Sequence, residues 1–379
     1  MKFNALRLTV LCLCLLSFRA AATTYYVDIN NTNATPPYTN WSTAATDIQS
    51  AVNQTTNGDS VLVNPGVYQS GGYTAPDGSL TAVVVTNAVT IQGVDGLAQT
   101  SINGSNTMRC LYLGNGASLM GFTLTNGAAG NGGGVFCPST TALLANCLLI
   151  SNSASSGGGA YSGTISNCTL TENICPPTGG NGGGAANSVL YNCTVSGNVT
   201  GGNTGATSGG GANNCKLTGC TVSGNASHGA GAAGGGAYTS TLNNCTVSGN
   251  SADDLAGGTY NCNCTNSSLL NNTALEGGGA SGGTLVNCTI SGNNAYSDGG
   301  GVYYGATIYN STLSGNVAQE GGGADDCTLI NCLLTGNTAS SSYDAGAGAN
   351  YGTLINCTVV NNTAVYYEIV NNQIVGYAA

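Results

Sequence analysis

The feature that most constrains this chain is a short segment that returns every 21 to 27 residues. "NCTVSGN" stands at 192–198 and again at 244–250, and its core "CTVSGN" also stands at 220–225. Ten such units can be aligned on the residue that follows the first Asn. The anchors are Cys147, Cys168, Cys193, Cys220, Cys245, Ser267, Cys288, Ser311, Cys332 and Cys357. A period of this length indicates a solenoid, a propeller or another repeat array.

Two apolar columns keep fixed positions around the anchor. Leu, Ile or Cys stands three residues before it, and Leu, Val or Ile stands two residues after it. Side chains alternate between faces along a strand, so these columns predict two short strands whose buried residues are out of phase. The residue before the anchor is Asn in nine units and Gly219 in the other, and both types tolerate a left-handed backbone. We therefore expect a bend at that residue in every coil.

An Asn stands five residues after every anchor. A buried polar column is costly unless its members hydrogen-bond, and the amide group both donates and accepts. We predict that these residues stack and bond from coil to coil: Asn152, Asn173, Asn198, Asn225, Asn250, Asn272, Asn293, Asn316, Asn337 and Asn362.

A run of Gly followed by Ala or Val recurs in most units and predicts a tight turn and a third strand. Three strands per coil of 21–27 residues predict an all-β fold, a parallel β-helix. The leucine-rich repeat is the rival fold, and "LINCTVVNNTA" at 354–364 fits its pattern. That fold needs a helical convex side, and the corresponding place holds "SSGGGAYSG" at 155–163.

The ends of the chain differ from the repeats. Residues 1–22 have the basic start, short apolar run and small-residue end of a secretory signal peptide, with a membrane anchor as the alternative. Residues 23–68 are expected to form an N-terminal cap. Its amphipathic helix would place Trp41, Ala44, Ala45, Ile48, Ala51 and Val52 on one face. Residues 69–364 would form the β-helix, and 365–379 a tail that is either truncated or docked to a partner.

The stretch "AATDIQSAVNQ" at 44–54, followed by "GDSVLVNPGVY" at 58–68 and the Asn column, resembles the pectin-lyase-like superfamily. The "SGNxA" and "GGGA" segments resemble repeats of bacterial polymorphic outer-membrane proteins, with Val, Leu or Ile in place of their Phe. The resemblance covers roughly residues 24–365. It implies a right-handed parallel β-helix, secreted or exposed on a bacterial cell envelope, and it is specific for fold rather than function.

Charge excludes one class of partner. Without the signal peptide the basic residues are Arg109 and Lys216, and all 15 carboxylates remain, so the net charge is 2 − 15 = −13. Nucleic acids require basic residues to neutralise phosphates, so no nucleic-acid partner is expected. No segment after the signal is long and apolar enough to span a membrane as a helix.

The cysteines of the anchor column are interpreted as small buried residues. Side chains stacked in parallel strands hold their Cβ atoms about 4.8 Å apart, beyond the range that disulfides use. Local bridges at Cys262/Cys264 and at Cys137/Cys175 remain open.

The residues do not assemble a catalytic set. The resemblance implies either a basic residue beside calcium-binding aspartates, as in lyases, or clustered Asp with Gly-His-Gly and Arg-x-Lys segments, as in polygalacturonases. Arg109 and Lys216 lack those surroundings, "ADDC" at 324–327 supplies only an Asp pair, and His228 lies in a loop. We assign no catalytic residue and keep a polysaccharide lyase or glycoside hydrolase as the alternative to a structural role.

Glu276, Asp298 and Glu320 each precede a Gly triplet in three successive coils. Stacking would place them about 5 Å apart, where like charges repel unless a cation bridges them, and Ca²⁺ prefers oxygen ligands. Ca²⁺ is the only cofactor suggested, and none is required. The alternatives are a solvated acidic edge and the carboxylate pair of a glycoside hydrolase.

An aromatic column follows the Gly runs: Phe136, Tyr161, Tyr238, Tyr260 and Tyr303. Outward aromatic rings can stack on sugars, although they also serve as ordinary cover for a sheet. We predict a structural or adhesive surface protein in which Tyr161, Tyr238, Tyr260 and Tyr303 bind a glycan. A polysaccharide or a surface protein would be the partner, and the oligomeric state stays open.

Overall fold

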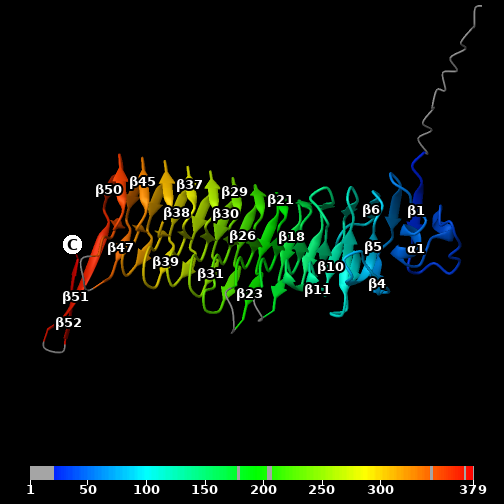
Figure 1. Ribbon diagram of the computed structural model, residues 1–379, viewed down its shortest axis with the longest axis horizontal. Helices are drawn as coiled ribbons and strands as arrows, with labels where there is room; N and C mark the ends of the chain where they lie inside the picture. The colour runs from blue at the N-terminus through cyan, green and yellow to red at the C-terminus, as the bar shows by residue number, and fades with distance from the viewer. Residues whose placement is uncertain (1–20, 177–179, 203–206, 342–344, 371–372, 379) are drawn as a thin grey trace, which may run out of the picture.

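The chain folds into a stack of coils that each contribute one short strand to each of four sheets. In this computed structural model the described residues are 21–176, 180–202, 207–341, 345–370 and 373–378, and side chains are described as far as residue 365. The coils stack along one long axis, with the N-terminal segment at one end and the C-terminal strands at the other (Figure 1). The predicted signal peptide lies almost wholly outside the described residues.

Two sheets hold the strands that flank the anchor residue. Sheet A contains β1 (Thr24–Val27), β2 (Ser60–Val63), β6 (Thr90–Gly93), β9 (Ser118–Met120), β13 (Leu143–Ala145), β17 (Thr164–Ser166), β21 (Val189–Tyr191), β25 (Lys216–Thr218), β29 (Thr241–Asn243), β33 (Asn263–Thr265), β37 (Thr284–Val286), β41 (Thr307–Tyr309), β45 (Thr328–Ile330) and β49 (Thr353–Ile355). Sheet B contains β3 (Gly66–Tyr68), β7 (Thr100–Asn103), β10 (Thr123–Thr125), β14 (Leu148–Ile150), β18 (Thr169–Thr171), β22 (Thr194–Ser196), β26 (Thr221–Ser223), β30 (Thr246–Ser248), β34 (Ser268–Leu270), β38 (Thr289–Ser291), β42 (Thr312–Ser314), β46 (Leu333–Thr335) and β50 (Thr358–Val360).

Sheet C follows the Gly runs and sheet D follows the Asn column. Sheet C contains β4 (Tyr73–Thr74), β5 (Leu80–Val85), β8 (Arg109–Leu113), β12 (Val135–Phe136), β16 (Ala160–Tyr161), β20 (Ala185–Ala186), β24 (Ala212–Asn213), β28 (Ala237–Tyr238), β32 (Thr259–Tyr260), β36 (Ala280–Ser281), β40 (Val302–Tyr303), β44 (Ala324–Asp325) and β48 (Ala349–Asn350). Sheet D contains β11 (Ala128–Asn131), β15 (Ser153–Ser156), β19 (Ile174–Cys175), β23 (Val199–Gly201), β27 (Ala226–His228), β31 (Ser251–Ala252), β35 (Thr273–Ala274), β39 (Asn294–Ala295), β43 (Val317–Ala318), β47 (Thr338–Ala339), β51 (Thr363–Val370) and β52 (Gln373–Ala378).

The right-handed parallel β-helix is confirmed, but the predicted number of strands per coil is wrong. Each full coil has four strands rather than three, because the residues after the Asn column also pair from coil to coil, as Ala128 does with Ser153. The pairing is parallel throughout, except at the hairpins β4–β5 and β51–β52.

The predicted bend is confirmed at the residue before every anchor. The nine Asn residues there have φ between 48° and 56°, and Gly219 has φ 65°. Further left-handed residues lie five positions earlier, as at Asn214, and five positions later, as at Gly224. A left-handed residue turns the chain sharply, so corners spaced five residues apart give the coil its four sides.

The Asn ladder is also confirmed. Each side-chain amide nitrogen from Asn152 to Asn337 donates to the amide oxygen of the next Asn in the column, at 2.8–3.0 Å. The same nitrogen also donates to a backbone carbonyl of the preceding coil, as Asn225 does to Val195 at 2.9 Å. The buried polar column therefore satisfies its own hydrogen bonds.

The anchor cysteines are free thiols, as are Cys137, Cys175, Cys262 and Cys264. They hydrogen-bond as well as pack: the backbone nitrogen of Cys147 donates to Sγ of Cys168 at 3.2 Å. Ser267 fills the same place, because its hydroxyl accepts from the nitrogen of Cys245 at 3.1 Å. Ser can replace Cys at the anchor because both are small side chains that accept a hydrogen bond from the backbone nitrogen of the neighbouring anchor.

The cap helix is shorter than predicted. A 3₁₀ turn, η1 (Trp41–Thr43), and a short helix, α1 (Ile48–Val52), begin at separate caps, Asn40 and Asp47. Ala44 between them is extended, so Trp41 leaves the expected face, is 40% exposed and packs edge-on against Tyr26. The other predicted residues of that face are buried. Within the described residues, no helix has the length and apolarity needed to cross a membrane.

The C-terminal strands leave part of the core of the last coil exposed. β51 pairs with β47 and then turns into a hairpin with β52, which projects from the end of the stack (Figure 1). Leu354 and Val359 are 39% and 46% exposed, whereas their counterparts in the coil before, Leu329 and Leu334, are fully buried.

Candidate functional site

The outward residues of sheet C form one column along the β-helix. In these two-residue strands the second residue follows the residue that faces the core, and the register pairs Tyr238 with Tyr260, and Tyr303 with Asp325. The second residues Ser281, Asp325 and Asn350 are nevertheless buried. From β28 to β48 the outward residues are Tyr238, Tyr260, Ser281, Tyr303, Asp325 and Asn350. Parallel pairing thus brings aromatic and acidic side chains from distant parts of the sequence into one row.

The predicted aromatic column exists but is divided. Tyr238 and Tyr260 stack with ring centroids 5.0 Å apart, and Phe136 and Tyr161 stack at 5.3 Å. Ala186 and Asn213 separate the two groups. All four rings are half-buried, so each keeps some surface open to solvent.

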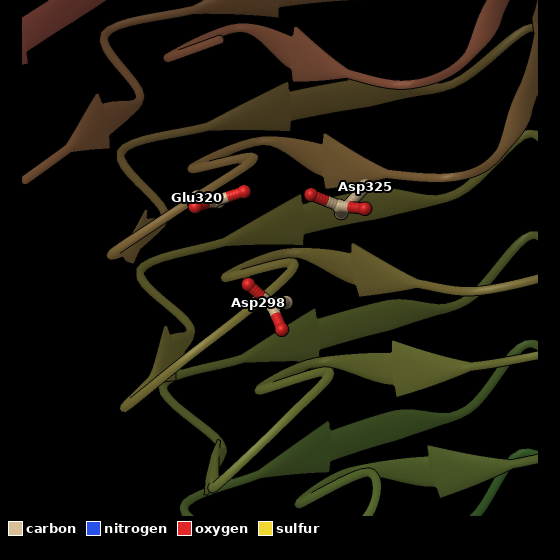
Figure 2. A group of neighbouring side chains, drawn as sticks. All are labelled: Asp298, Glu320 and Asp325. Carbon is tan, nitrogen blue, oxygen red and sulfur yellow. The ribbon is translucent and has the colours of Figure 1, made fainter. Parts of the chain in front are cut away.

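An acidic group lies at the C-terminal part of the same face. Asp298, Glu320 and Asp325 each offer a carboxylate oxygen, and these three oxygens lie within 4.8 Å of one another (Figure 2). Asp298 and Glu320 are paired across neighbouring coils at the Gly turns, as their sequence positions predict. Asp325 comes instead from β44, and Asn350 donates to it at 2.8 Å and to Glu320 at 3.2 Å.

Glu276 lies outside this group of three. It pairs with Leu255 across the Gly turns, and its carboxylate interacts electrostatically with Tyr303. Ser281 separates Tyr303 from Tyr260 in the outward column. Tyr303 interacts electrostatically with Glu276 and pairs with Asp325 in the next coil, so it is the aromatic residue of this column that lies beside the acidic residues.

Burial and mutual repulsion shift the ionisation of this face. Asp325 is only 6% exposed, and burial, followed by the charges of Asp298 and Glu320, raises its pKa although Asn350 opposes the shift. Burial also raises the pKa of Glu276, and burial together with Glu276 raises the pKa of Tyr303 to about 12. A bound cation would relieve this concentration of negative charge.

The sequence pattern missed Asp325 as a member of the site. In the sequence it stands out only as half of the Asp pair in "ADDC", because the predicted acidic row consists of the residues directly before the Gly triplets. The signal was its position directly after the inward Ala324, the position that Tyr303 occupies in the preceding coil.

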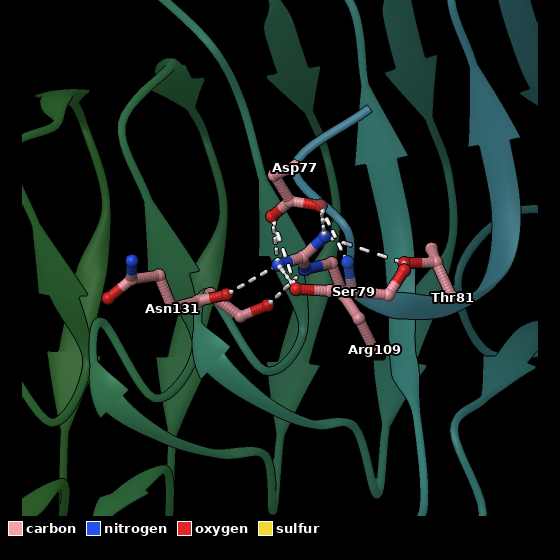
Figure 3. Close-up of polar contacts among 6 residues, drawn as sticks. Asp77, Ser79, Thr81, Arg109 and Asn131 are labelled. Atoms are coloured by element: carbon pink, nitrogen blue, oxygen red, sulfur yellow. Dashed lines mark hydrogen bonds and ion pairs between the residues drawn. The ribbon is translucent and has the colours of Figure 1, made fainter. Parts of the chain in front are cut away.

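The basic residues lie apart from the acidic group of Asp298, Glu320 and Asp325. Arg109 is fully buried in β8, where it makes two contacts with Asp77, at 2.7 and 3.2 Å, and further bonds to Ser79, Thr81 and Asn131 (Figure 3). Its guanidinium also lies 4.9 Å from the ring centre of Phe136. These contacts fasten the hairpin β4–β5 to the β-helix and leave Arg109 no access to a substrate.

Lys216 and His228 lie on other sheets. Lys216 is an exposed outward residue of β25 in sheet A. His228 ends β27 in sheet D, where its Nδ1 lies 3.1 Å from an oxygen of the exposed Asp253. The side chains that a lyase or polygalacturonase mechanism would need are therefore not gathered around the acidic group.

Comparison with known proteins gives likeness in structure only. No family model and no curated protein matches the chain. Among solved structures, the Dettilon tailspike protein is 12% identical, with 88% of this chain and 68% of that chain covered and a TM-score of 0.44. A rhamnogalacturonan lyase is 11% identical, with 89% and 87% covered and a TM-score of 0.41. A PL6 family polysaccharide lyase from Pseudopedobacter saltans is 13% identical, with 83% and 92% covered and a TM-score of 0.39. The fold assignment rests on the strand pairing rather than on these likenesses.

Proposed function

We propose that this chain is a secreted or surface-exposed β-helical protein that binds polysaccharide on the outer face of sheet C, in a structural or adhesive role. The observation that carries the proposal is the position of Tyr303, the aromatic residue of the outward column that lies beside the acidic residues. Aromatic rings supply apolar faces for sugar rings, and carboxylates supply hydrogen-bond acceptors for their hydroxyls. Tyr161, on the other aromatic group, would extend the contact along the same sheet.

We predict that Tyr238→Ala together with Tyr260→Ala abolishes binding to a polysaccharide that the parent protein retains in affinity electrophoresis. Each lost ring contact of about 1.4 kcal/mol would weaken binding about tenfold. Pectin is the first polymer to test. Tyr309→Ala is the matched control, because Tyr309 is an exposed Tyr on sheet A. Equal retention of parent and double variant would contradict the assignment of these rings.

We further propose Ca²⁺ as a ligand of the acidic group, held by Asp298, Glu320 and Asp325 with Glu276 alongside. Ca²⁺ takes oxygen ligands at about 2.3–2.6 Å, so two oxygens on opposite sides of the ion lie about 4.6–5.2 Å apart. The three carboxylates lie within 4.8 Å of one another, which fits such an ion without rearrangement of the backbone.

Ca²⁺ at a hundred times its Kd should stabilise the fold by about 2.7 kcal/mol, an increase in melting temperature that EDTA reverses. Asp325→Asn should remove this response. In EDTA at neutral pH the same variant should have a higher melting temperature than the parent protein, because it lacks the buried carboxylate that the neighbouring acidic residues repel.

The pH dependence of that difference follows from the raised pKa of Asp325. The parent protein regains the lost stability as pH falls through this pKa, so the difference should vanish below about pH 3.9, the unfolded value. Asp95→Asn is the control, since Asp95 is exposed and outside the group. An unchanged melting temperature in Ca²⁺ and in EDTA would remove the calcium proposal and leave the aromatic one standing.

Glycoside hydrolysis is a second candidate function, favoured by one observation. A buried carboxyl with a raised pKa, beside two other carboxyls, has the arrangement of a general acid and its partner. The same polysaccharide panel decides between the two functions. Release of new reducing ends by the parent protein, lost in Asp325→Asn, would favour hydrolysis, and binding without any product would favour the adhesive role.

A further inference from the structure

The outer face of sheet B carries two files of hydroxyl groups. Every strand from β18 to β46 presents its first and third residues outward and buries its second. The first file is Thr169, Thr194, Thr221, Thr246, Ser268, Thr289 and Thr312, and the second is Thr171, Ser196, Ser223, Ser248, Ser291, Ser314 and Thr335. Only Leu270 and Leu333 interrupt them. We call this surface the hydroxyl face.

The two files form a regular lattice. Thr194 pairs with Thr221 and Thr221 with Thr246, and the register is kept without a slip through all eight strands. Neighbours along a file are therefore about 4.8 Å apart, and the two files are about 6.6 Å apart, twice the rise per residue. The left-handed corners and the Asn ladder hold each coil at the same register, which keeps the lattice constant.

The chemistry of the hydroxyl face is uniform and neutral. None of its sixteen outward positions is charged or aromatic. Two hydrogen bonds join neighbours along the second file, Ser196 to Thr171 at 3.4 Å and Ser314 to Ser291 at 3.1 Å. The face therefore offers hydroxyls and methyl groups at fixed intervals, without a charge to attract an ion or a ring to stack on a sugar.

We propose that the hydroxyl face binds the surface of ice crystals. An ice surface is itself a neutral lattice of donors and acceptors, and its oxygen rows repeat on the same scale as the two spacings of this face. Each hydroxyl donates and accepts, so it can bond to a lattice water, and the Thr methyl groups can lie between the oxygen rows. A rigid array has little order to lose on binding, which favours adsorption.

This proposal does not depend on the function of sheet C, because sheets B and C are different faces of the coil. The alternative ligand of the hydroxyl face is a neutral, extended polysaccharide, whose hydroxyls could also hydrogen-bond to it. The two ligands are distinguished by testing the protein with ice alone and with polysaccharide alone.

The test is partition of the whole protein into slowly growing ice, together with thermal hysteresis of the same solution. The parent protein should enter the ice and separate freezing from melting temperature. Thr221→Tyr with Thr246→Tyr should lower both signals to those of an inert globular protein, because two bulky rings in the middle of the lattice hold it off a flat surface. Thr241→Tyr is the control, since Thr241 is an exposed outward residue of β29 on sheet A, and it should behave as the parent does.

A second pair of changes guards against loss of folding. Ser223→Thr with Ser248→Thr adds the missing methyl groups on β26 and β30 and should increase thermal hysteresis, which an unfolded protein cannot do. Exclusion of the parent protein from ice would overturn the proposal. An equal loss of ice binding in the sheet A control would also overturn it. So would binding of the parent protein to a neutral polysaccharide that the sheet B variant loses, if the same variant leaves the ice signals unchanged.

Discussion

Replacing Asn225 by alanine is expected to lower the free energy of unfolding by about 4 kcal/mol or more. The amide oxygen of Asn225 accepts from the backbone nitrogen and the amide nitrogen of Asn198, both at 2.9 Å. Its amide nitrogen donates to the carbonyl of Val195 and to Asn250, again at 2.9 Å. Alanine removes all four bonds. The amide oxygen of Asn250 keeps the bond from the backbone nitrogen at 225, and the amide nitrogen of Asn198 keeps its bond to Leu170, but the buried backbone nitrogen of Asn198 loses its acceptor, and each unsatisfied buried group costs about 1–3 kcal/mol.

The effect should be local, because the coils of a solenoid contact only their neighbours. Urea unfolding followed by circular dichroism measures its size, and hydrogen exchange should accelerate first in β22, β26 and β30. Asn243→Ala is the matched control: Asn243 is exposed on the outer face of β29, and its loss should change stability by no more than about 0.5 kcal/mol. Similar losses for both variants would mean that the ladder contributes nothing beyond its volume.

The parts of the fold that could be predicted from sequence are those in which one residue type has one physical role. Asn before each anchor marks a left-handed corner, and Asn five residues after it marks the ladder, so both columns could be assigned before any coordinates. The cap was harder, because Asn40 and Asp47 each start a helical turn, and the extended Ala44 between them breaks the face that contained Trp41.

Sheet D escaped prediction for a different reason. Its strands, such as Ser153–Ser156, hold small and polar residues without an apolar alternation. They are strands because each coil places the same backbone groups next to those of the neighbouring coil, as Val199 and Ala226 are paired. This is tertiary information, since strands of two to four mostly small residues carry too little local propensity to mark a strand.

The candidate site shows the same division. The spacing of Glu276, Asp298 and Glu320 from the Gly triplets predicted their row, because it follows the repeat. Asp325 belongs to a second column, and its closeness to Asp298 and Glu320 depends on how the chain turns between β44 and the Gly corner. A cluster that combines residues before the Gly triplets with outward residues of sheet C can be recognised only when the structure places both columns on one surface.

Replacing Gly211 by alanine is expected to lower the free energy of unfolding by about 3 kcal/mol, the upper part of the range for overpacking. A Cβ at this position would lie 2.6 Å from the carbonyl oxygen of Gly236 in the next coil and 3.0 Å from the amide group of Asn225. The next coil cannot move away easily, because Gly211 and Ala212 donate backbone hydrogen bonds to Gly235 and Gly236 at 3.1 and 3.0 Å. The Gly triplet is therefore required by the distance between coils rather than by the turn alone.

Gly224→Ala separates these two explanations. Gly224 is a corner with φ 62° and has no atom within 4 Å of a built Cβ, so alanine there meets only the strain of the left-handed conformation, about 1–2 kcal/mol. Urea unfolding of both variants should place Gly211→Ala clearly below Gly224→Ala in stability. The reverse order would mean that the corners, and not the close stacking of the Gly runs, set the glycine content of the coil. With the expected order, a side chain at the Gly runs would meet the backbone of the next coil, and the outward column of sheet C directly follows these close contacts.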